Sequence, residues 1–375
     1  MFESSRRRML QALGIGGAAA LAGCSNNEPQ EATNTGTEAT TTSQSDQAKS
    51  IDADQVAADP TDLPDPVDWN SPRNHEVTLE AEEVTAEIED GVTFDYMTFN
   101  GQIPGPMVRV RQGDTVTFTM ENLEENNLPH NVDFHAIYGT GGGSVATTAS
   151  PGSANSMEFE AQYPGAFIYH CAVPNLDQHI SAGMFGMILV EPEGGLPEVD
   201  RELYFGQHEL YTDKDVGTTG HHNFDMEAMK NEAPTYVLLN GEKYAYAAAG
   251  RGPVEVNKGD RVRVFMVDGG PNLSSNFHPI GNVWTRAYRD GGLPDDGEFE
   301  AYADPNIQTM KVPPGSCMIG EMETPVPSRI KIVDHALSRV ARRGLLAEVD
   351  VLGSEEESIF DPDANGSSHE GPIYN

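Results

Sequence analysis

The chain has 375 residues and a formal net charge of −36, from 59 acidic and 23 basic residues. This charge excludes nucleic acid as a partner, and it is typical of a halophile protein, because high salt screens self-repulsion within a few ångströms. The length accommodates two domains of about 150 residues each. Three cysteines are too few for a disulfide framework.

The first 23 residues are predicted to be a targeting segment and not part of a fold. Three consecutive arginines, residues 6–8, resemble a twin-arginine export signal, and the apolar run 12–22 is too short to span a bilayer. Leu21 to Cys24 resembles a lipoprotein processing box, with an ordinary cleavage site as the alternative. We therefore expect an exported, extracytoplasmic protein, tethered to the outer face of the cell membrane by a lipid on Cys24.

Residues 24–72 are rich in Thr, Ser, Gln, Asp and Glu and contain almost no aromatic residues. Such a composition cannot bury enough apolar surface to fold, so it predicts a disordered acidic tether. Residues 354–375 are predicted to be an acidic C-terminal tail.

From about residue 73, short alternating segments are broken by Gly, Pro and Asn, as in all-β sandwiches. Residues 108–119 alternate apolar and polar side chains around a Gly-Asp turn, and residues 254–265 repeat this pattern. Further turn residues recur in the same order at similar offsets. We therefore predict an all-β fold of two tandem Greek-key β-sandwich domains, residues 73–193 and 194–353.

Cys171, His179 and Met184 bring a thiolate, an imidazole and a thioether together on one short loop. With one more histidine, these groups form the ligand set of a blue-copper electron-transfer centre. The second copy lacks this loop. Its Cys317 falls where the first copy has Ala154, and we predict a buried structural thiol there.

Neighbouring residues on a strand face opposite sides, so His170 and Cys171 cannot easily bind one metal. His130 and His135, in the segment HNVDFH, also differ by an odd number and face opposite sides if the segment is extended. The predicted sets are therefore His130, Cys171, His179 and Met184 on the inside, and His135 and His170 on the outside. The peptide bond between His170 and Cys171 is a short covalent path between the two sites.

A third histidine is expected for the outer site, and His335 is the best candidate, although a histidine ending a strand is often only a polar terminus. Three histidines with one open position are a catalytic arrangement for copper. Asp133 lies two residues before His135 and shares its face. It is an orienting group, a general acid or a hydrogen-bonded turn residue. His278 is a candidate proton donor or a satisfied buried histidine.

Two other features are assigned no metal or ligand. His221 and His222 lack partners at metal spacing, and we predict that they lie at the surface. The glycine-rich run Gly139–Gly143 is not a phosphate-binding loop, because no lysine or helix start follows it.

Five motifs together resemble those of copper-containing nitrite reductases, a cupredoxin-like family, and the tether and acidity resemble haloarchaeal members. The motifs occur in the family's order in residues 130–135, 169–173, 179–184, 270–281 and 332–335. The resemblance implies one blue, or type 1, copper on His130, Cys171, His179 and Met184. It implies one catalytic, or type 2, copper on His135, His170 and a His335 from the neighbouring subunit, and hence a homotrimer.

The implied activity is dissimilatory one-electron reduction of nitrite to nitric oxide and water, as in denitrification. Asp133 and His278 are implied as the proton-handling pair, and Ile280 as a residue that shapes the nitrite pocket. The implied electron donor is a small blue-copper protein or a cytochrome.

Two alternatives belong to other functional classes. A laccase-like multicopper oxidase needs paired H-x-H motifs, and none occurs in this sequence. A blue-copper electron carrier without catalysis needs a single metal, which leaves His135, His170 and His335 without a joint purpose.

Overall fold

The structure is a computed structural model, and it describes residues 55–295 and 297–364. The predicted signal segment and Cys24 lie outside the described residues. The predicted domain boundaries stay predictions.

The first copy consists of two sheets. Its first sheet has the strand order β10-β2-β1-β4-β6, in which the edge strand β10 comes from the second copy, and its second sheet has the order β3-β8-β7-β5. The bounds along the first sheet are Gly220–His222 (β10), Val92–Phe99 (β2), Asn74–Glu89 (β1), Thr115–Asn122 (β4) and Ser153–Glu160 (β6). Those along the second sheet are Val108–Arg111 (β3), Phe185–Glu191 (β8), Gly165–His170 (β7) and Asp133–Phe134 (β5).

The second copy also consists of two sheets, with the orders β11-β9-β13-β18-β15-β16 and β12-β20-β19-β14-β17. The first comprises Tyr236–Leu239 (β11), Arg201–Leu210 (β9), Arg261–Gly270 (β13), Ser316–Glu323 (β18), Trp284–Tyr288 (β15) and Asp304–Ile307 (β16). The other comprises Val254–Asn257 (β12), Ala347–Leu352 (β20), Arg329–Asp334 (β19), Ser275–Ile280 (β14) and Met310–Val312 (β17).

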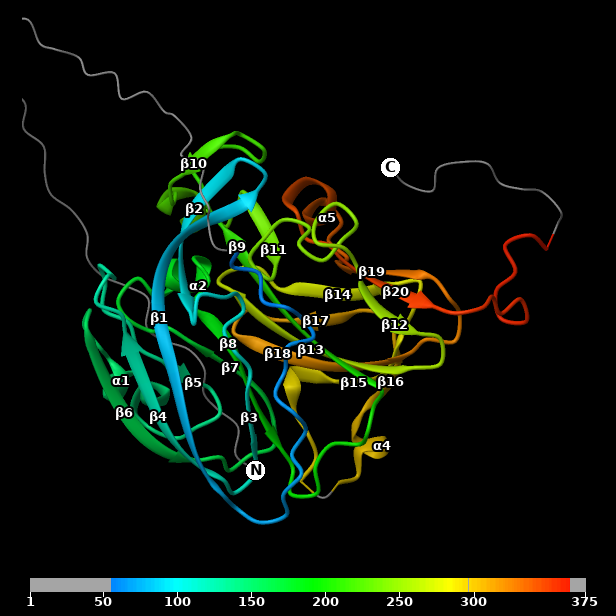
Figure 1. The fold of residues 1–375 in the computed structure, drawn as a ribbon, viewed down its shortest axis with the longest axis horizontal. Helices are drawn as coiled ribbons and strands as arrows, with labels where there is room; N and C mark the ends of the chain where they lie inside the picture. The colour runs from blue at the N-terminus through cyan, green and yellow to red at the C-terminus, as the bar shows by residue number, and fades with distance from the viewer. Residues whose placement is uncertain (1–54, 296, 365–375) are drawn as a thin grey trace, which may run out of the picture. The chain divides into compact units, whose positions relative to one another are not determined.

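The strand pairing repeats between the copies. β1 pairs in parallel with β4, and β4 pairs antiparallel with β6; β9, β13 and β18 repeat this arrangement. Likewise β8 pairs in parallel with β3 and antiparallel with β7, and β20 pairs in the same way with β12 and β19. Figure 1 shows most first-copy strands, blue to green, on one side and the yellow to orange strands of the second copy on the other. The prediction of two tandem β-sandwiches is confirmed.

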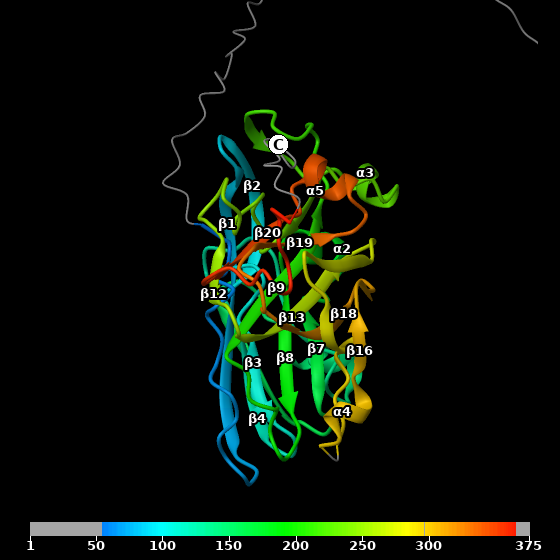
Figure 2. The ribbon, with the colours of Figure 1, turned by 90° about the vertical axis from the view of Figure 1, so that its right-hand side faces the viewer.

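Helices are short and connect the strands. They are Thr140–Gly143 (η1), Ser144–Thr147 (α1), Leu176–Ser181 (α2), Met226–Lys230 (α3), Arg289–Gly291 (η2), Phe299–Tyr302 (α4) and Ser338–Arg343 (α5). Figure 2 shows α3 and α5 at the same end of the sandwiches. Within the described residues, no helix has both the length and the apolar character that a bilayer crossing requires.

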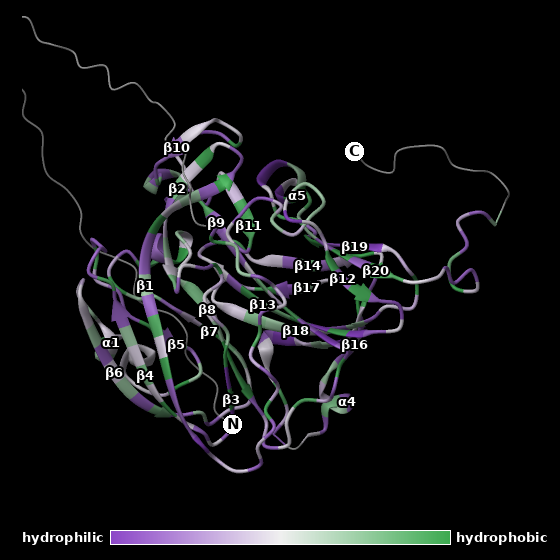
Figure 3. Cartoon of the chain, in the orientation of Figure 1, coloured by the Kyte–Doolittle hydropathy of each residue, from purple (hydrophilic) through white to green (hydrophobic). Residues whose placement is uncertain are grey.

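Hydrophobic side chains gather in three cores. One lies inside the first copy, between residues 79 and 190, and one inside the second, between residues 203 and 351. The third draws on both copies, from Val56 to Ile319, and joins them. Along β1 the buried and exposed positions alternate, and Figure 3 shows the matching bands of hydrophobic and hydrophilic residues. This alternation is the period of a strand with one face in a core.

The end of the predicted tether differs from the prediction, because residues 55–72 pack on the sandwiches. Val56 is fully buried, and its carbonyl accepts a hydrogen bond from the Ile103 amide at 2.7 Å. The Ala58 carbonyl accepts one from Asn240 Nδ2 of the second copy at 2.9 Å. Composition could not predict this contact, because backbone groups and a few small apolar residues form it.

The prediction of a surface position is wrong for His222. It lies on β10, which pairs with β2 of the first copy, and it is fully buried. Its ring nitrogens contact Thr212 Oγ1 and the Thr218 carbonyl at 3.1 and 2.7 Å. Cys317 is confirmed as a buried free thiol, and burial raises its pKa well above the ordinary value.

Candidate metal centres

The end of strand β7 contributes one residue to each of the two candidate sites. It lies between β8 and β5, and His170 is its last residue. The Cys171 amide donates to the Met184 carbonyl at 3.1 Å, so the extended backbone continues one residue further. His170 is 8% exposed and Cys171 is fully buried. Because of the strand pleat, the side chains of His170 and Cys171, two potential ligands, lie on opposite sides of one strand.

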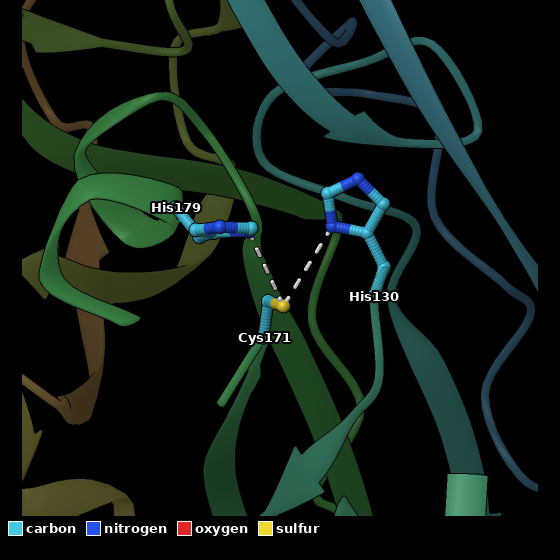
Figure 4. Close-up of side chains that lie close together, drawn as sticks. All are labelled: His130, Cys171 and His179. Carbon is cyan, nitrogen blue, oxygen red and sulfur yellow. Dashed lines mark hydrogen bonds between the residues drawn. The ribbon is translucent and has the colours of Figure 1, made fainter. Parts of the chain in front are cut away.

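On one side, Cys171 lies between two histidines from separate loops. Its Sγ is 3.8 Å from His130 Nδ1 and 3.6 Å from His179 Nδ1, as Figure 4 shows. The three ligand atoms lie within 4.8 Å of one another, and all three residues are buried. This group is called the inner cluster below.

The loop after Cys171 brings His179 and Met184 back to it. His179 lies on α2, and the Met184 amide donates to the His179 carbonyl at 3.0 Å. Met184 is fully buried, in the same hydrophobic core as Cys171. The predicted thioether ligand is thus in a residue whose backbone hydrogen-bonds to both Cys171 and His179.

Glu83 on β1 orients the His130 ring. Its Oε1 is 3.1 Å from His130 Nε2 and accepts the amides of Asn127 and Leu128 at 3.1 and 2.9 Å. When His130 is neutral and Nε2–H donates to this carboxylate, Nδ1 keeps its lone pair toward Cys171. These hydrogen bonds also lower the pKa of Glu83, against the opposing effect of its burial.

Burial sets the protonation states of the inner cluster. It lowers the pKa of His130, and it lowers that of His179 to about 4, with a contribution from the neighbouring His130. Both rings are therefore neutral at pH 7 and can act as ligands. Burial raises the pKa of Cys171, so its thiolate needs a cation beside it, as a bound metal provides.

On the other side of β7, Asp133, His135 and His170 form a second group, called the outer cluster below, with ligand atoms within 4.8 Å of one another. His135 Nε2 and His170 Nε2 are 3.1 Å apart. His170 Nδ1 is 3.0 Å from the Cys171 carbonyl, which can only accept, so Nε2 carries the lone pair of the neutral ring. Partial burial and the His170 ring lower the pKa of His135.

The predicted second-copy residues lie elsewhere in the same chain. The rings of His278, on β14, and His335, after β19, are 5.1 Å apart at an interplanar angle of 69°. His278 Nδ1 donates to the Gln308 carbonyl at 2.5 Å, and Ile280 is 39% exposed. Among the described residues, His335 does not join the outer cluster within one chain.

The spacing of the donor atoms fits metal ions. Bonds of about 2.0 Å to nitrogen and about 2.3 Å to sulfur, at angles between tetrahedral and trigonal, separate nitrogen from sulfur by about 3.5–3.7 Å. The inner cluster has 3.6 and 3.8 Å. The 3.1 Å between the outer imidazoles corresponds to an angle of about 100° at a metal ion with such bonds. A soft thiolate site and a histidine site both match copper chemistry.

Two further residues near the inner cluster were not predicted from the sequence. Glu83 lies on a long strand with no motif around it. Asn131 lies inside the HNVDFH segment. Its Oδ1 is 3.8 Å from Cys171 Sγ and accepts a hydrogen bond from the Ala172 amide at 2.7 Å. Only its position beside His130 could have indicated it.

Comparisons with known proteins agree with copper chemistry. Residues 80–195 match the family model described as multicopper oxidase. The chain is similar to the copper-containing nitrite reductase of Neisseria meningitidis serogroup B, with 39% identity over 318 residues, 85% of this chain and 79% of that protein. A solved copper nitrite reductase from Nitrosomonas europaea has 31% identity and a TM-score of 0.66, covering 76% of this chain and 95% of that one. A multicopper oxidase structure with 23% identity and a TM-score of 0.64 shares the fold.

Proposed function

The chain belongs to the family of copper-containing nitrite reductases, and from this premise we propose how its residues reduce nitrite. A type 1 copper is held by His130, Cys171, His179 and Met184. A type 2 copper is held by His135, His170 and the neighbouring subunit's His335. The product is nitric oxide, formed with water from one nitrite, one electron and two protons.

The observation that carries this proposal is the placement of the two clusters on opposite sides of β7. When bound, copper supplies one-electron storage at the inner cluster and binding and reduction of nitrite at the outer one. The peptide between Cys171 and His170 is the covalent path between them. The hydrogen bond from His170 Nδ1 to the Cys171 carbonyl, at 3.0 Å, is a second path.

Asp133 and His278 are proposed to hold the protons that convert one nitrite oxygen to water. The Asp133 carboxyl group lies within 4.8 Å of the outer imidazoles, where it can face a ligand in the open position. His278 donates through Nδ1 to the Gln308 carbonyl, so its Nε2 can accept and release a proton. Ile280, two residues further along β14, presents an apolar side chain beside it.

The assembly proposed is a homotrimer with catalytic sites between subunits. One chain carries His135, His170 and Asp133 in the first copy, and His278 with His335 in the second. These are two halves of one site that a single chain does not join, and a cyclic arrangement of copies would join them three times.

The cellular location and the electron donor are proposed from the sequence alone. A twin-arginine signal would export the chain, and a lipid on Cys24 would hold it at the outer face of the membrane of a halophile. A small blue-copper protein or a cytochrome would supply the electrons.

Two other functions are less well supported. A laccase-like oxidase needs a cluster of three coppers, and the described residues contain only two groups of His, Cys and acidic residues at metal spacing. An electron carrier has no use for the outer cluster. The two relatives described above with more than 30% identity are both copper nitrite reductases, which favours nitrite reduction.

Metal analysis and electron paramagnetic resonance (EPR), followed by an assay of nitric oxide released from nitrite with a reduced dye, test the proposal. Two copper signals per chain and nitrite-dependent gas are expected. A single signal without gas would favour the electron carrier, and oxygen consumption would favour the oxidase.

A further inference from the structure

The glycine-rich run Gly139–Gly143 lies against the outer cluster. Its residues 140–143 form η1. A Cβ atom added to Gly142 would lie 1.9 Å from Asp133 Oδ1, 2.9 Å from its Cγ and 2.8 Å from the Phe134 carbonyl oxygen. No side chain fits at these distances, so the backbone of Gly142 occupies the space beside the Asp133 carboxyl group.

Backbone conformation alone does not explain why position 142 requires glycine. Gly141 and Gly142 are both left-handed, with φ of 58° and 53°, a region that favours glycine at either position. A Cβ at Gly141, however, would meet only the Ser144 side chain, which can rotate away. The requirement for bare backbone against Asp133 is specific to Gly142.

The segment that follows holds the run in place. Thr147 Oγ1 accepts the Val132 amide at 3.1 Å, and the Asn131 side chain donates to Thr148 Oγ1 at 3.1 Å. The backbones of His130 and Ala149 exchange two hydrogen bonds, at 3.0 and 2.8 Å. The run is therefore fixed relative to the residues just before Asp133.

Asp133 depends on this contact because it has few others. Its side chain is half-buried and, within the described part of the chain, accepts no hydrogen bond. A carboxyl group without hydrogen-bond donors keeps one rotamer only if packing excludes the others. Gly142 supplies that packing beside Oδ1 of the carboxyl group.

We propose that Gly142 is a positioning residue of the enzyme, whose backbone sets the direction in which the Asp133 carboxyl group faces nitrite. This inference rests on the proposed role of Asp133. It gives the glycine-rich run a function in orienting the carboxyl group, with no bond to substrate or metal.

Gly142→Ala and Gly141→Ala form a matched pair, because both place alanine in the same left-handed conformation. For Gly142→Ala we expect kcat to fall by about 10²-fold, as for a misplacement near 1 Å, with the absorption of the blue site and the content of both coppers unchanged. For Gly141→Ala we expect a kcat within about threefold of the parent enzyme. Equal kcat values in the two variants would overturn the proposal.

A double-variant cycle separates positioning from general damage. If Gly142 acts through Asp133, Gly142→Ala should not reduce kcat further in an Asp133→Ala background. An additional loss there would overturn the proposal. If Gly142→Ala alone gives too little folded protein, recovery of two-copper protein should improve in the double variant, which removes the nearest clash. No improvement would count against the contact.

The proposed function and this inference can fail separately. Full activity of Asp133→Asn would remove the role of Asp133, whatever Gly142 does. An inactive Asp133→Asn together with a fully active Gly142→Ala would leave the function intact and reject the positioning role.

Discussion

His170 and Cys171 share a peptide bond, yet their side chains lie in different clusters. His170 Nε2 is 3.1 Å from His135 Nε2, whereas Cys171 Sγ is 3.8 and 3.6 Å from the ring nitrogens of His130 and His179. Because the strand separates the two clusters, a substitution on one side need not disturb the metal on the other.

His135→Ala tests this independence. We expect the blue absorption to persist, copper to fall from two ions per chain to one, and nitrite turnover to fall to background. His130→Ala is the matched change on the inner side, and it should abolish the blue absorption. Loss of the blue absorption in His135→Ala would contradict the assignment of the two histidines to separate metals.

The pairing of histidines with clusters could be predicted from the sequence because it depends on local geometry. His170 and Cys171 are adjacent on a strand, and the strand period fixes their faces. For His130 and His135 the rule worked although only Asp133 and Phe134 between them are in a strand. His130 lies in an isolated bridge with Ala149, and His135 begins the turn that follows the strand.

Contacts between distant segments could not be predicted in the same way. Glu83 is 47 positions before His130, and Gly142 meets Asp133 only because the chain turns back after β5. Residues 55–58 pack through backbone hydrogen bonds that leave no pattern in composition. His222 is buried because β10 adds an edge strand to the sheet of the other copy.

Asp133→Asn keeps the size of the side chain and removes its ability to transfer a proton. We expect both coppers to remain and kcat to fall by about 10²–10⁴-fold, as for other proton-transfer residues. Steady-state assays with a reduced dye, alongside copper analysis of the same samples, measure this. Undiminished turnover would exclude Asp133 from the reaction.

Glu83→Gln tests the orientation of His130. The amide can still accept a hydrogen bond, but the negative charge beside Nε2 is lost, so the ring becomes a weaker donor to the oxidised metal. We expect a higher reduction potential of the blue site, measured by redox titration of its absorption. Glu80→Gln, an exposed change on the same strand, is the control, and an equal potential in both variants would argue against the orienting role.

Acid should destabilise the protein through His208, which is fully buried. Its Nδ1 is 2.9 Å from the Ser181 carbonyl, its Nε2 has no partner among the described residues, and burial lowers its pKa to about 4. Between an unfolded pKa of about 6.5 and this folded value, the unfolded chain binds a proton that the folded chain does not. Stability is therefore lost as the pH falls through this window.

His208→Asn removes this linkage. From about 1.4 kcal/mol per pKa unit, the parent protein should lose about 2–3 kcal/mol relative to the variant between pH 7.5 and pH 4.5. Denaturant unfolding of both proteins at the two pH values measures the change in their difference. A difference in unfolding free energy that stays constant across this range would show that His208 does not titrate as inferred.

Sharing of the catalytic site between subunits predicts complementation between inactive variants. His135→Ala damages the first-copy half of a site and His335→Ala the second-copy half, so each homotrimer should be inactive. In a randomly mixed trimer, a site is intact when one subunit supplies His135 and its neighbour supplies His335. Each requirement is met with a probability of one half, so co-expression should restore about a quarter of the parent activity.

The matched control is co-expression of His135→Ala with His170→Ala. Both changes lie in the same half of the site, so no pairing of these subunits gives an intact set, and activity should stay at background. Tandem purification through two tags removes the homotrimers, and each remaining mixed trimer of His135→Ala and His335→Ala should then have one intact site in three, or about a third of the parent activity. Only separation of two ligands onto two chains allows one lesion to compensate for the other. Absence of complementation between His135→Ala and His335→Ala would therefore show that these two histidines are not divided between neighbours, and complementation in the control would show that His135 and His170 come from different chains.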